Sequence, residues 1–269
     1  MNANAPIGIF DSGVGGLTVA RAIRDLLPKE DILYFGDTAH LPYGDRSPAL
    51  IRQYAEGITN FLLEKHCKAI VIACNSASAN ALETVIRIAG DRVDVFDVIS
   101  PIVKHVASVH PNKVVGIIGT KATINSKSYP KAFDDINANN EIKALATPLL
   151  APMIEEGFVH DEISKAVLKR YLDRPELQGI ELLLLGCTHY PIISEDVKAL
   201  TADRIEIIDP PQVVAKQVQL QLEEKKLLAQ RAKGDQHFYV SDLTEAFSTS
   251  TRLFFGEDAK LTSVDLWNS

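Results

Sequence analysis

The sequence has few cysteines, and this scarcity excludes a secreted disulfide scaffold. It contains three, Cys67, Cys74 and Cys187, and neither their number nor their spacing is that of a disulfide framework. We therefore expect three free thiols. Each of them is inert core filler, a metal ligand or a reactive group.

Long apolar runs and clusters of basic residues are also lacking. The longest apolar runs, residues 69–74 and 182–185, are far below the roughly 20 residues that a membrane span needs. The opening segment MNANAPIGIF does not resemble a signal peptide, so we expect a cytoplasmic protein without a membrane segment. The net charge is −7 and there is no basic stripe, which argues against nucleic acid as a partner.

What the sequence does contain is the material for two α/β domains. Its 269 residues, 46% of them hydrophobic, suffice for two cores. Short apolar runs alternate with segments whose apolar residues recur three and four positions apart, a pattern typical of parallel βαβ units. The expected strands cover residues 7–10, 32–35, 69–73, 93–96, 114–118, 142–146, 181–185, 205–208, 237–240 and 261–264. The clearest expected helices cover residues 17–27, 49–64, 77–88, 163–172 and 213–228.

The order of the motifs indicates an internal duplication. A strand ends in Asp11 near the start of the chain, and a similar strand ends at Thr120, 109 residues later. A second pair of strands ends in Cys74 and Cys187, 113 residues apart. Two related halves explain these nearly equal offsets, although a chance alignment of two α/β halves would give the same pattern. Because the strand at 237–240 could rejoin the first sheet, we expect one domain of residues 1–98 plus 209–269 and a second of residues 99–208.

Two of the cysteines stand where chemistry is expected. Cys74 and Cys187 each close an apolar strand and precede a segment compatible with a helix. Ligands of open α/β sheets bind beyond the carboxyl ends of the strands, and a helix N-terminus favours thiolate. A single buried cysteine is more often structural than catalytic, but two at equivalent places of two halves favour a catalytic pair. Cys67 has no such counterpart, and we expect it to be inert.

An opposed pair of thiols suits the inversion of a stereocentre. One group must remove the α-proton of an amino acid and another must deliver a proton from the opposite face. Asp11 could assist Cys74, although it could equally be the N-cap of the helix that follows. His189 could assist Cys187, with Glu155 as its partner.

Metal and nucleotide chemistry are weaker interpretations of the same residues. Cys74, Cys187 and His189 are zinc-compatible, but no CxxC or HxxxH pairing accompanies them. The run Gly13-Val14-Gly15-Gly16 lacks the GxGxxG spacing of a dinucleotide site. We expect these glycines to allow a tight turn or the close approach of the backbone to a small carboxylate. No lysine stands in a recognisable loop for pyridoxal phosphate.

Small polar groups suit a dicarboxylic zwitterion as the ligand. The loop Pro42-Tyr43-Gly44 could present backbone N–H groups and a phenol to a carboxylate. Additional hydrogen-bonding groups without charge are Asn75, Ser76, Thr120, Thr123 and Thr188.

Six motifs, in order along nearly the whole chain, carry a family resemblance. They are IGIFDSGVGGLTV at 7–19, YFGDTAHLPYG at 34–44, ACNSASA at 73–79, GIIGTKAT at 116–123, PMIEEG at 152–157 and GCTHYP at 186–191. With these motifs the sequence resembles the glutamate racemases of the aspartate/glutamate racemase superfamily. Ser76 departs from the family, many members of which carry threonine at this position.

The resemblance implies a fold, an activity and a set of roles. It implies two flavodoxin-like halves related by pseudo-twofold symmetry, often a homodimer, and racemisation of glutamate without a cofactor or metal, supplying D-glutamate for the peptidoglycan cell wall. Cys187 would take the proton from L-glutamate and Cys74 from D-glutamate. Asp11 and His189 would assist. Either Glu155 or Glu156 could fill the carboxylate position beside His189, and the PMIE match favours Glu155. Substrate contacts would fall on Asp11-Ser12, Tyr43-Gly44, Asn75-Ser76 and Thr188-His189.

Three other functions remain compatible with the residues. Two α/β lobes around a hinge also suit a non-catalytic amino-acid binding module, although the paired cysteines argue against it. An aspartate racemase and a metal-assisted hydrolase are the alternatives among enzymes. The residues alone do not separate glutamate from aspartate.

Overall fold

The computed structural model describes residues 2–202, 204–243, 251–256 and 259–267 of the chain. Each of the ten expected strands is present within one residue of its predicted bounds. The strands are β1 (Ile7–Asp11), β2 (Ile32–Gly36), β3 (Ala69–Ile72), β4 (Asp94–Asp97), β5 (Val114–Gly119), β6 (Glu141–Ala146), β7 (Leu182–Gly186), β8 (Glu206–Ile208), β9 (Gln236–Val240) and β10 (Leu261–Ser263).

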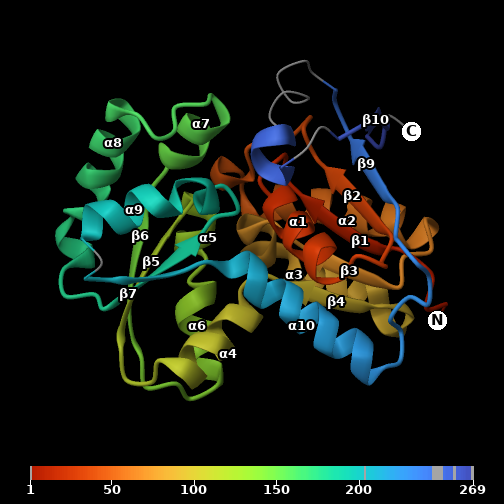
Figure 1. The fold of residues 1–269 in the computed structure, drawn as a ribbon, viewed down its shortest axis with the longest axis horizontal. Helices are drawn as coiled ribbons and strands as arrows, with labels where there is room; N and C mark the ends of the chain where they lie inside the picture. The colour runs from red at the N-terminus through yellow and green to blue at the C-terminus, as the bar shows by residue number, and fades with distance from the viewer. Residues whose placement is uncertain (1, 203, 244–250, 257–258, 268–269) are drawn as a thin grey trace.

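The strands form two sheets in which all neighbouring strands run parallel. The six-stranded sheet has the order β10-β9-β2-β1-β3-β4, and the four-stranded sheet has the order β6-β5-β7-β8. Figure 1 shows the four-stranded sheet on the left and the six-stranded sheet on the right, with helices packed around each. The expected α/β class with two parallel sheets is confirmed.

The two sheets repeat one topology. The order β2-β1-β3-β4 in the first sheet corresponds to β6-β5-β7-β8 in the second, and both follow the 2-1-3-4 succession of flavodoxin-like folds. This correspondence pairs β1 with β5 and β3 with β7. It therefore pairs the strand that ends at Asp11 with the one before Thr120, and the strand before Cys74 with the one before Cys187, as the duplication predicts.

Helices cover both faces of the sheets. They are α1 (Leu17–Leu26), α2 (Pro48–Glu64), α3 (Asn75–Ala89), α4 (Ser100–Val109), α5 (Lys121–Asn125), α6 (Ser128–Asp135), α7 (Leu150–Glu155), α8 (Glu162–Leu172), α9 (Ser194–Thr201) and α10 (Pro210–Glu224). Because helices lie on both faces, strands such as β1, β3 and β7 are buried along their whole length and have no polar-apolar alternation.

The expected helix at 213–228 is displaced toward the N-terminus. Helix α10 starts at Pro210, because proline is well tolerated in the first turn, where its missing N–H has no helical partner. It ends at Glu224, and Lys226 adopts a left-handed backbone conformation (φ 56°) that stops the helix.

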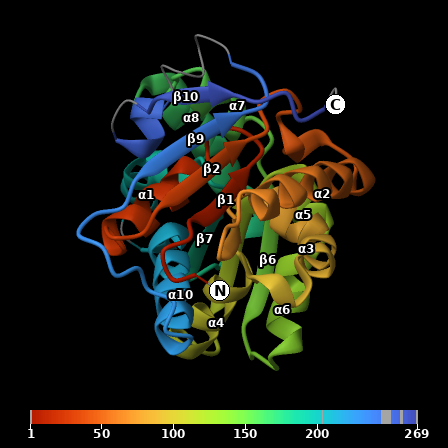
Figure 2. The same ribbon diagram turned by 90° about the vertical axis from the view of Figure 1, so that its right-hand side faces the viewer.

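The C-terminal part of the chain returns to the first sheet. Strand β9 pairs with β2 and β10 pairs with β9, and Figure 2 shows β10, β9, β2 and β1 in succession. Helix α10 packs against α1 of the first half and also against α4 and β7 of the second. These contacts agree with a discontinuous first domain, and the division into residues 1–98 plus 209–269 and residues 99–208 stays a prediction.

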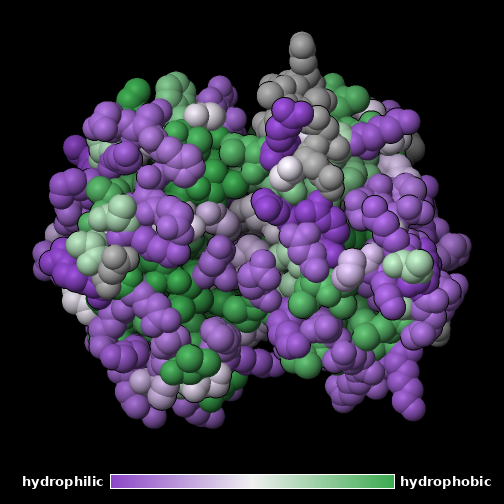
Figure 3. Space-filling view, viewed as in Figure 1, coloured by the Kyte–Doolittle hydropathy of each residue, from purple (hydrophilic) through white to green (hydrophobic). Residues whose placement is uncertain are grey.

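Hydrophilic side chains cover most of the face shown in Figure 3, and apolar residues show in patches between them. Within the described part of the chain, no helix is long and apolar enough to cross a membrane. Among the residues that the structure describes, the buried apolar side chains form three clusters around the two sheets.

Candidate active site

Cys74 lies at the junction between β3 and α3. It is the N-cap of α3, and its Sγ accepts a hydrogen bond from the backbone N–H of Ala77 at 3.4 Å. Its thiol also donates to Ser12 Oγ at 3.7 Å, which joins it to the loop after β1. The sulfur atom is therefore fixed by the strand-to-helix turn at the carboxyl edge of the first sheet.

Cys187 follows β7 at the corresponding place in the second sheet. Its Sγ lies 3.6 Å from His189 Nδ1, and His189 Nε2 lies 2.8 Å from Glu155 Oε1. Glu155 is the last residue of α7, whereas Glu156 is exposed to solvent. Of the two adjacent carboxylates, Glu155 is the one in contact with His189.

A single cavity of about 30 Å³ brings the two cysteines together. It lies between the carboxyl edges of the two sheets, and both halves contribute to its walls. Its lining contains most of the residues expected from the sequence: Ser12, Pro42, Tyr43, Gly44, Cys74, Asn75, Ser76, Thr120, Glu155, Cys187, Thr188 and His189. Ala151 also lines it and was not expected, because a small apolar residue in a helix gives no signal in the sequence.

Two expected site residues do not line the cavity. Thr123 is buried and its hydroxyl lies 3.0 Å from Thr120 Oγ1 and 3.4 Å from Ser76 Oγ. Since Ser76 Oγ and Thr120 Oγ1 are themselves 2.8 Å apart, these three hydroxyls join the two halves beside the cavity. Asp11 is the other residue outside the lining.

Asp11 is completely buried at the end of β1, and its two oxygens have different surroundings. Oδ2 accepts hydrogen bonds from the N–H groups of Gly13 at 3.1 Å and Gly16 at 3.0 Å. Because α1 starts only at Leu17 with Gly16 as N-cap, Asp11 is not the cap, although it binds the backbone at the helix entry. Among the described residues, Oδ1 has no hydrogen-bond partner. One oxygen thus holds the backbone of this loop, and the other makes no such bond.

Two glycines of the run stand where a side chain would collide with a neighbour. A Cβ added at Gly15 would lie 2.5 Å from Cε1 and Nδ1 of His189, and one at Gly16 would lie 2.5 Å from the Asp11 Cβ. Thr18 Oγ1 donates to the backbone oxygen of Thr188 at 3.0 Å nearby. We expected a tight turn or the approach of a small carboxylate, whereas Gly15 approaches His189 of the second half and Gly16 approaches Asp11 of its own half.

Comparison with known proteins decides the family. The family model described as Asp/Glu/hydantoin racemase matches residues 17–218. The chain belongs to this family. It is 42% identical over 255 residues to the glutamate racemase of Chlorobium phaeobacteroides, covering 94% of this chain and 93% of that one.

Solved structures of racemases from this family have the same fold. The glutamate racemase of Francisella tularensis, solved in complex with D-glutamate, has a TM-score of 0.93 and 39% identity, covering 99% of this chain and 100% of that one. The Thermus thermophilus enzyme, in complex with β-chloro-D-alanine, has a TM-score of 0.87 and 38% identity, covering 99% of each chain. The two-sheet architecture of the chain is thus that of the racemase family.

Electrostatics differ on the two sides of this racemase cavity. Burial raises the pKa of the Cys74 thiol, and the nearby Asp11 carboxylate raises it further. On the other side, burial lowers the pKa of His189, but the hydrogen bonds and charges of Cys187 and Glu155 reverse this effect and hold it well above the ordinary 6.5. The arrangement favours a protonated Cys74 and a cationic His189 beside Cys187.

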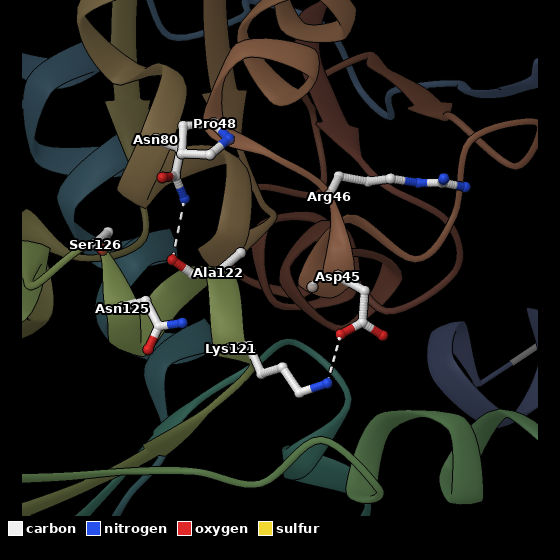
Figure 4. A pocket seen from close by; sticks show the side chains of 9 residues that line it. Asp45, Arg46, Pro48, Asn80, Lys121, Ala122, Asn125 and Ser126 are labelled. Atoms are coloured by element: carbon white, nitrogen blue, oxygen red, sulfur yellow. Dashed lines mark hydrogen bonds and ion pairs between the residues drawn. The ribbon is translucent and has the colours of Figure 1, made fainter.

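A larger pocket of about 390 Å³ adjoins the cavity and contains neither cysteine. Figure 4 shows the residues that line it, which are Gly44, Asp45, Arg46, Pro48 and Asn80 of the first half and Lys121, Ala122, Asn125 and Ser126 of the second. Lys121 Nζ lies 3.1 Å from Asp45 Oδ1, and Asn80 Nδ2 donates to the backbone oxygen of Ala122 at 3.2 Å. Gly44 lines both spaces, so the pocket and the cysteine cavity lie next to each other at this residue.

Proposed function

We propose that the chain interconverts L- and D-glutamate by proton transfer between the α-carbon and two cysteines, and that it supplies D-glutamate for peptidoglycan synthesis. The observation that carries the proposal is one cavity lined by Cys74 and Cys187, which follow equivalent strands of two sheets. Acid and base on opposite walls suit inversion at the carbon between them. The names of the glutamate racemases at about 40% identity support glutamate as the substrate.

In the L-to-D direction, the Cys187 thiolate takes the α-proton. The C–H bond breaks, an S–H bond forms, and the electron pair stays on the substrate, delocalised into the α-carboxylate. Cys74 then gives its thiol proton to the opposite face of the α-carbon and becomes a thiolate. The raised pKa of Cys74 favours the protonated form that this step requires, and cationic His189 stabilises the charge on Cys187.

The D-to-L direction starts with a thiolate at Cys74. Asp11 is suited to take the proton from this thiol, because burial raises the pKa of its carboxyl and its Oδ1 accepts no hydrogen bond from the part of the chain that the structure describes. His189 is suited to return the proton to Cys187, since Glu155 and Cys187 keep it protonated. Thus each thiol has its own auxiliary group. No step of this scheme uses a metal or a cofactor.

Apart from His189, the groups that would bind the two carboxylates of glutamate are neutral. None of the described residues that line the cavity is a lysine or an arginine. The available donors are hydroxyls, the Asn75 amide and backbone N–H groups at the start of α3, where the helix dipole favours an anion. Asn75 Oδ1 accepts a hydrogen bond from Tyr129 at 2.8 Å, which leaves its NH₂ group for a ligand. From the family resemblance we further expect a cytoplasmic homodimer.

Deuterium exchange tests the proposal. The protein is incubated with L- or D-glutamate in deuterated water, with a chelator and without added cofactor, while α-deuteration and optical rotation are followed. We expect inversion together with exchange, and Cys74→Ala or Cys187→Ala should abolish inversion. Cys67→Ala is the matched control, because this thiol is buried against Gly8, outside the lining of the cavity.

The same measurements distinguish the alternatives. Full inversion by Cys74→Ala would overturn the two-thiol mechanism. Faster turnover of aspartate than of glutamate would correct the substrate, and a strict requirement for a divalent cation would favour a hydrolase. Binding of glutamate without exchange of its α-proton would indicate a binding module.

A further inference from the structure

A buried carboxylate outside the cavity organises the loop that lines it. Asp37 follows β2 and is completely buried. Its backbone N–H donates to the backbone oxygen of Asp11 at 3.0 Å, so its position is tied to the end of β1. Its side chain contacts no lysine or arginine among the described residues; hydrogen bonds from neighbouring side chains compensate for its burial instead. These donors come from three separate segments of the chain.

The first donors belong to residues 38–46, the loop that lines the cavity and is called the cavity loop below. Tyr43 OH donates to Asp37 Oδ2 at 2.6 Å, and His40 Nδ1 lies 3.0 Å from the same oxygen. Tyr43 lines the cavity together with its neighbours Pro42 and Gly44. Burial and the charge of Asp37 raise the pKa of Tyr43 well above its ordinary value, so that the phenol keeps the proton it donates. Asp37 therefore determines where this wall of the cavity lies.

The remaining donors come from the C-terminal part of the chain. Ser241 Oγ donates to Asp37 Oδ1 at 2.8 Å, and Trp267 Nε1 donates to the same oxygen at 3.0 Å. Trp267 is the only tryptophan in the sequence and stands 230 residues from Asp37. Trp267 thus contacts Asp37, the carboxylate to which the side chains of the cavity loop are hydrogen-bonded.

The indole ring also fits a site prepared for it. It meets the rings of His40 and Tyr54 edge-on, at centroid distances of 4.8 Å and 5.6 Å, and His40 stacks on Tyr54 at 4.0 Å. A Cβ at Gly57 would lie 2.8 Å from the indole. Glycine inside a helix such as α2 lowers stability, and here its missing side chain makes room for the ring. The contact is therefore specific in shape as well as in hydrogen bonding.

We propose that Trp267 is a positioning residue, which holds Asp37 and, through it, Tyr43 and the loop that forms one wall of the cavity. It is not among the residues that line the cavity. Loss of its N–H leaves Asp37 Oδ1 with one donor fewer, so that the carboxylate whose Oδ2 accepts from the Tyr43 phenol is held less firmly. The kinetic test below depends on the proposed racemase function, whereas the exchange and fluorescence tests do not depend on catalysis.

Kinetics separate positioning from simple stabilisation. Trp267→Phe keeps an aromatic ring but removes the N–H, and we expect kcat/KM for glutamate to fall about tenfold, the equivalent of one hydrogen bond to a charged group. The matched control is Leu266→Ala, which removes packing from the same segment and the same apolar cluster but no hydrogen bond to Asp37. Leu266→Ala should lower the midpoint temperature of thermal unfolding and leave kcat/KM within about twofold of the wild-type value. An equal loss of kcat/KM in both variants would overturn the proposal.

Backbone amide exchange tests the loop directly and without substrate. We expect residues 38–46 to exchange faster in Trp267→Phe than in the wild type, and to be unchanged in Leu266→Ala. Unchanged exchange in Trp267→Phe would refute the proposal. If the wild type does not racemise glutamate but the exchange result holds, the proposed function fails while the coupling between Trp267 and the loop stands.

The single tryptophan also supplies its own spectroscopic readout. In Tyr43→Phe the phenol that shares Asp37 with Trp267 is missing, so we expect the emission of Trp267 to shift although that residue is untouched. Glutamate should change the emission of the wild type and change it less in Tyr43→Phe. Identical emission of the two proteins, with and without glutamate, would contradict the network.

Discussion

His189 Nε2 and Glu155 Oε1 lie 2.8 Å apart, and this contact sets the charge on one side of the cavity. The neighbouring Glu156 is exposed. The imidazole is thereby held between a carboxylate and the Cys187 sulfur, two groups that both favour its protonated form. The two sides of the cavity differ for this reason, since Cys74 is accompanied by a carboxyl group and a hydroxyl instead.

The two adjacent glutamates provide a matched pair of variants. We expect Glu155→Gln to lower kcat/KM by about tenfold to a hundredfold, because a charged hydrogen-bond partner of His189 is lost. Glu156→Gln should leave kcat/KM nearly unchanged. Steady-state rates in both directions measure the effect, and equal losses in the two variants would show that the contact with His189 has no special role.

The raised pKa of His189 predicts a pH dependence of stability. The folded state binds the proton of His189 more tightly than the unfolded state does, so protonation of His189 stabilises the fold. This contribution to the free energy of unfolding is complete below about pH 6.5 and is lost as the pH rises through the folded-state pKa of His189. The free energy of unfolding of the wild type should therefore decrease above pH 6.5 more steeply than that of His189→Gln. Urea denaturation of both proteins at several pH values measures this difference. Parallel curves would mean that His189 is not held in its cationic form.

Gly15 and Gly13 test the close contact between the two halves. A Cβ at position 15 collides with His189, whereas one at position 13 meets only Leu41 at 3.6 Å, an ordinary contact. Gly15→Ala should lower kcat/KM by about a hundredfold, because a displacement near 1 Å in a catalytic group has an effect of this size. Gly13→Ala should retain activity close to that of the wild type. Retained activity in Gly15→Ala would show that the loop can shift without moving His189.

A buried ion pair far from the cavity predicts a purely structural effect. Lys68 and Glu30 are both about 2% exposed or less, and Lys68 Nζ also donates to the backbone oxygen of Leu227 at 2.7 Å. Burial lowers the pKa of Lys68, which reflects the cost of placing its charge there. Lys68→Met should destabilise the protein by about 3–5 kcal/mol, because Glu30 is left buried without its partner.

Two further variants control this prediction. Lys68→Met combined with Glu30→Leu should recover part of the stability, since no unpaired charge remains. Lys169→Met, which breaks an exposed pair with Asp173, should change stability little. The prediction would be contradicted if denaturant unfolding showed only a small decrease in the free energy of unfolding for Lys68→Met alone.

The strands and the places of the cysteines follow from local properties of the sequence. Apolar runs of strand length predict β3 and β7, and the polar residues after them predict the turns at Cys74 and Cys187. Neighbouring residues determine this pattern, so it can be recognised without knowing how the chain packs. The end of α10 was less predictable, because the left-handed Lys226 carries no signal such as glycine.

The sequence alone determined the α/β class, the ten strands, the paired cysteines and the family to which the motifs belong. Only the tertiary structure decided that both cysteines line one cavity, that Glu155 rather than Glu156 meets His189, and that Trp267 supports Asp37. The physical reason is separation along the chain. Residues 34 and 230 positions apart meet, and the two cysteines 113 positions apart line one cavity, because of how sheets and helices pack, and no local pattern of residues encodes that packing.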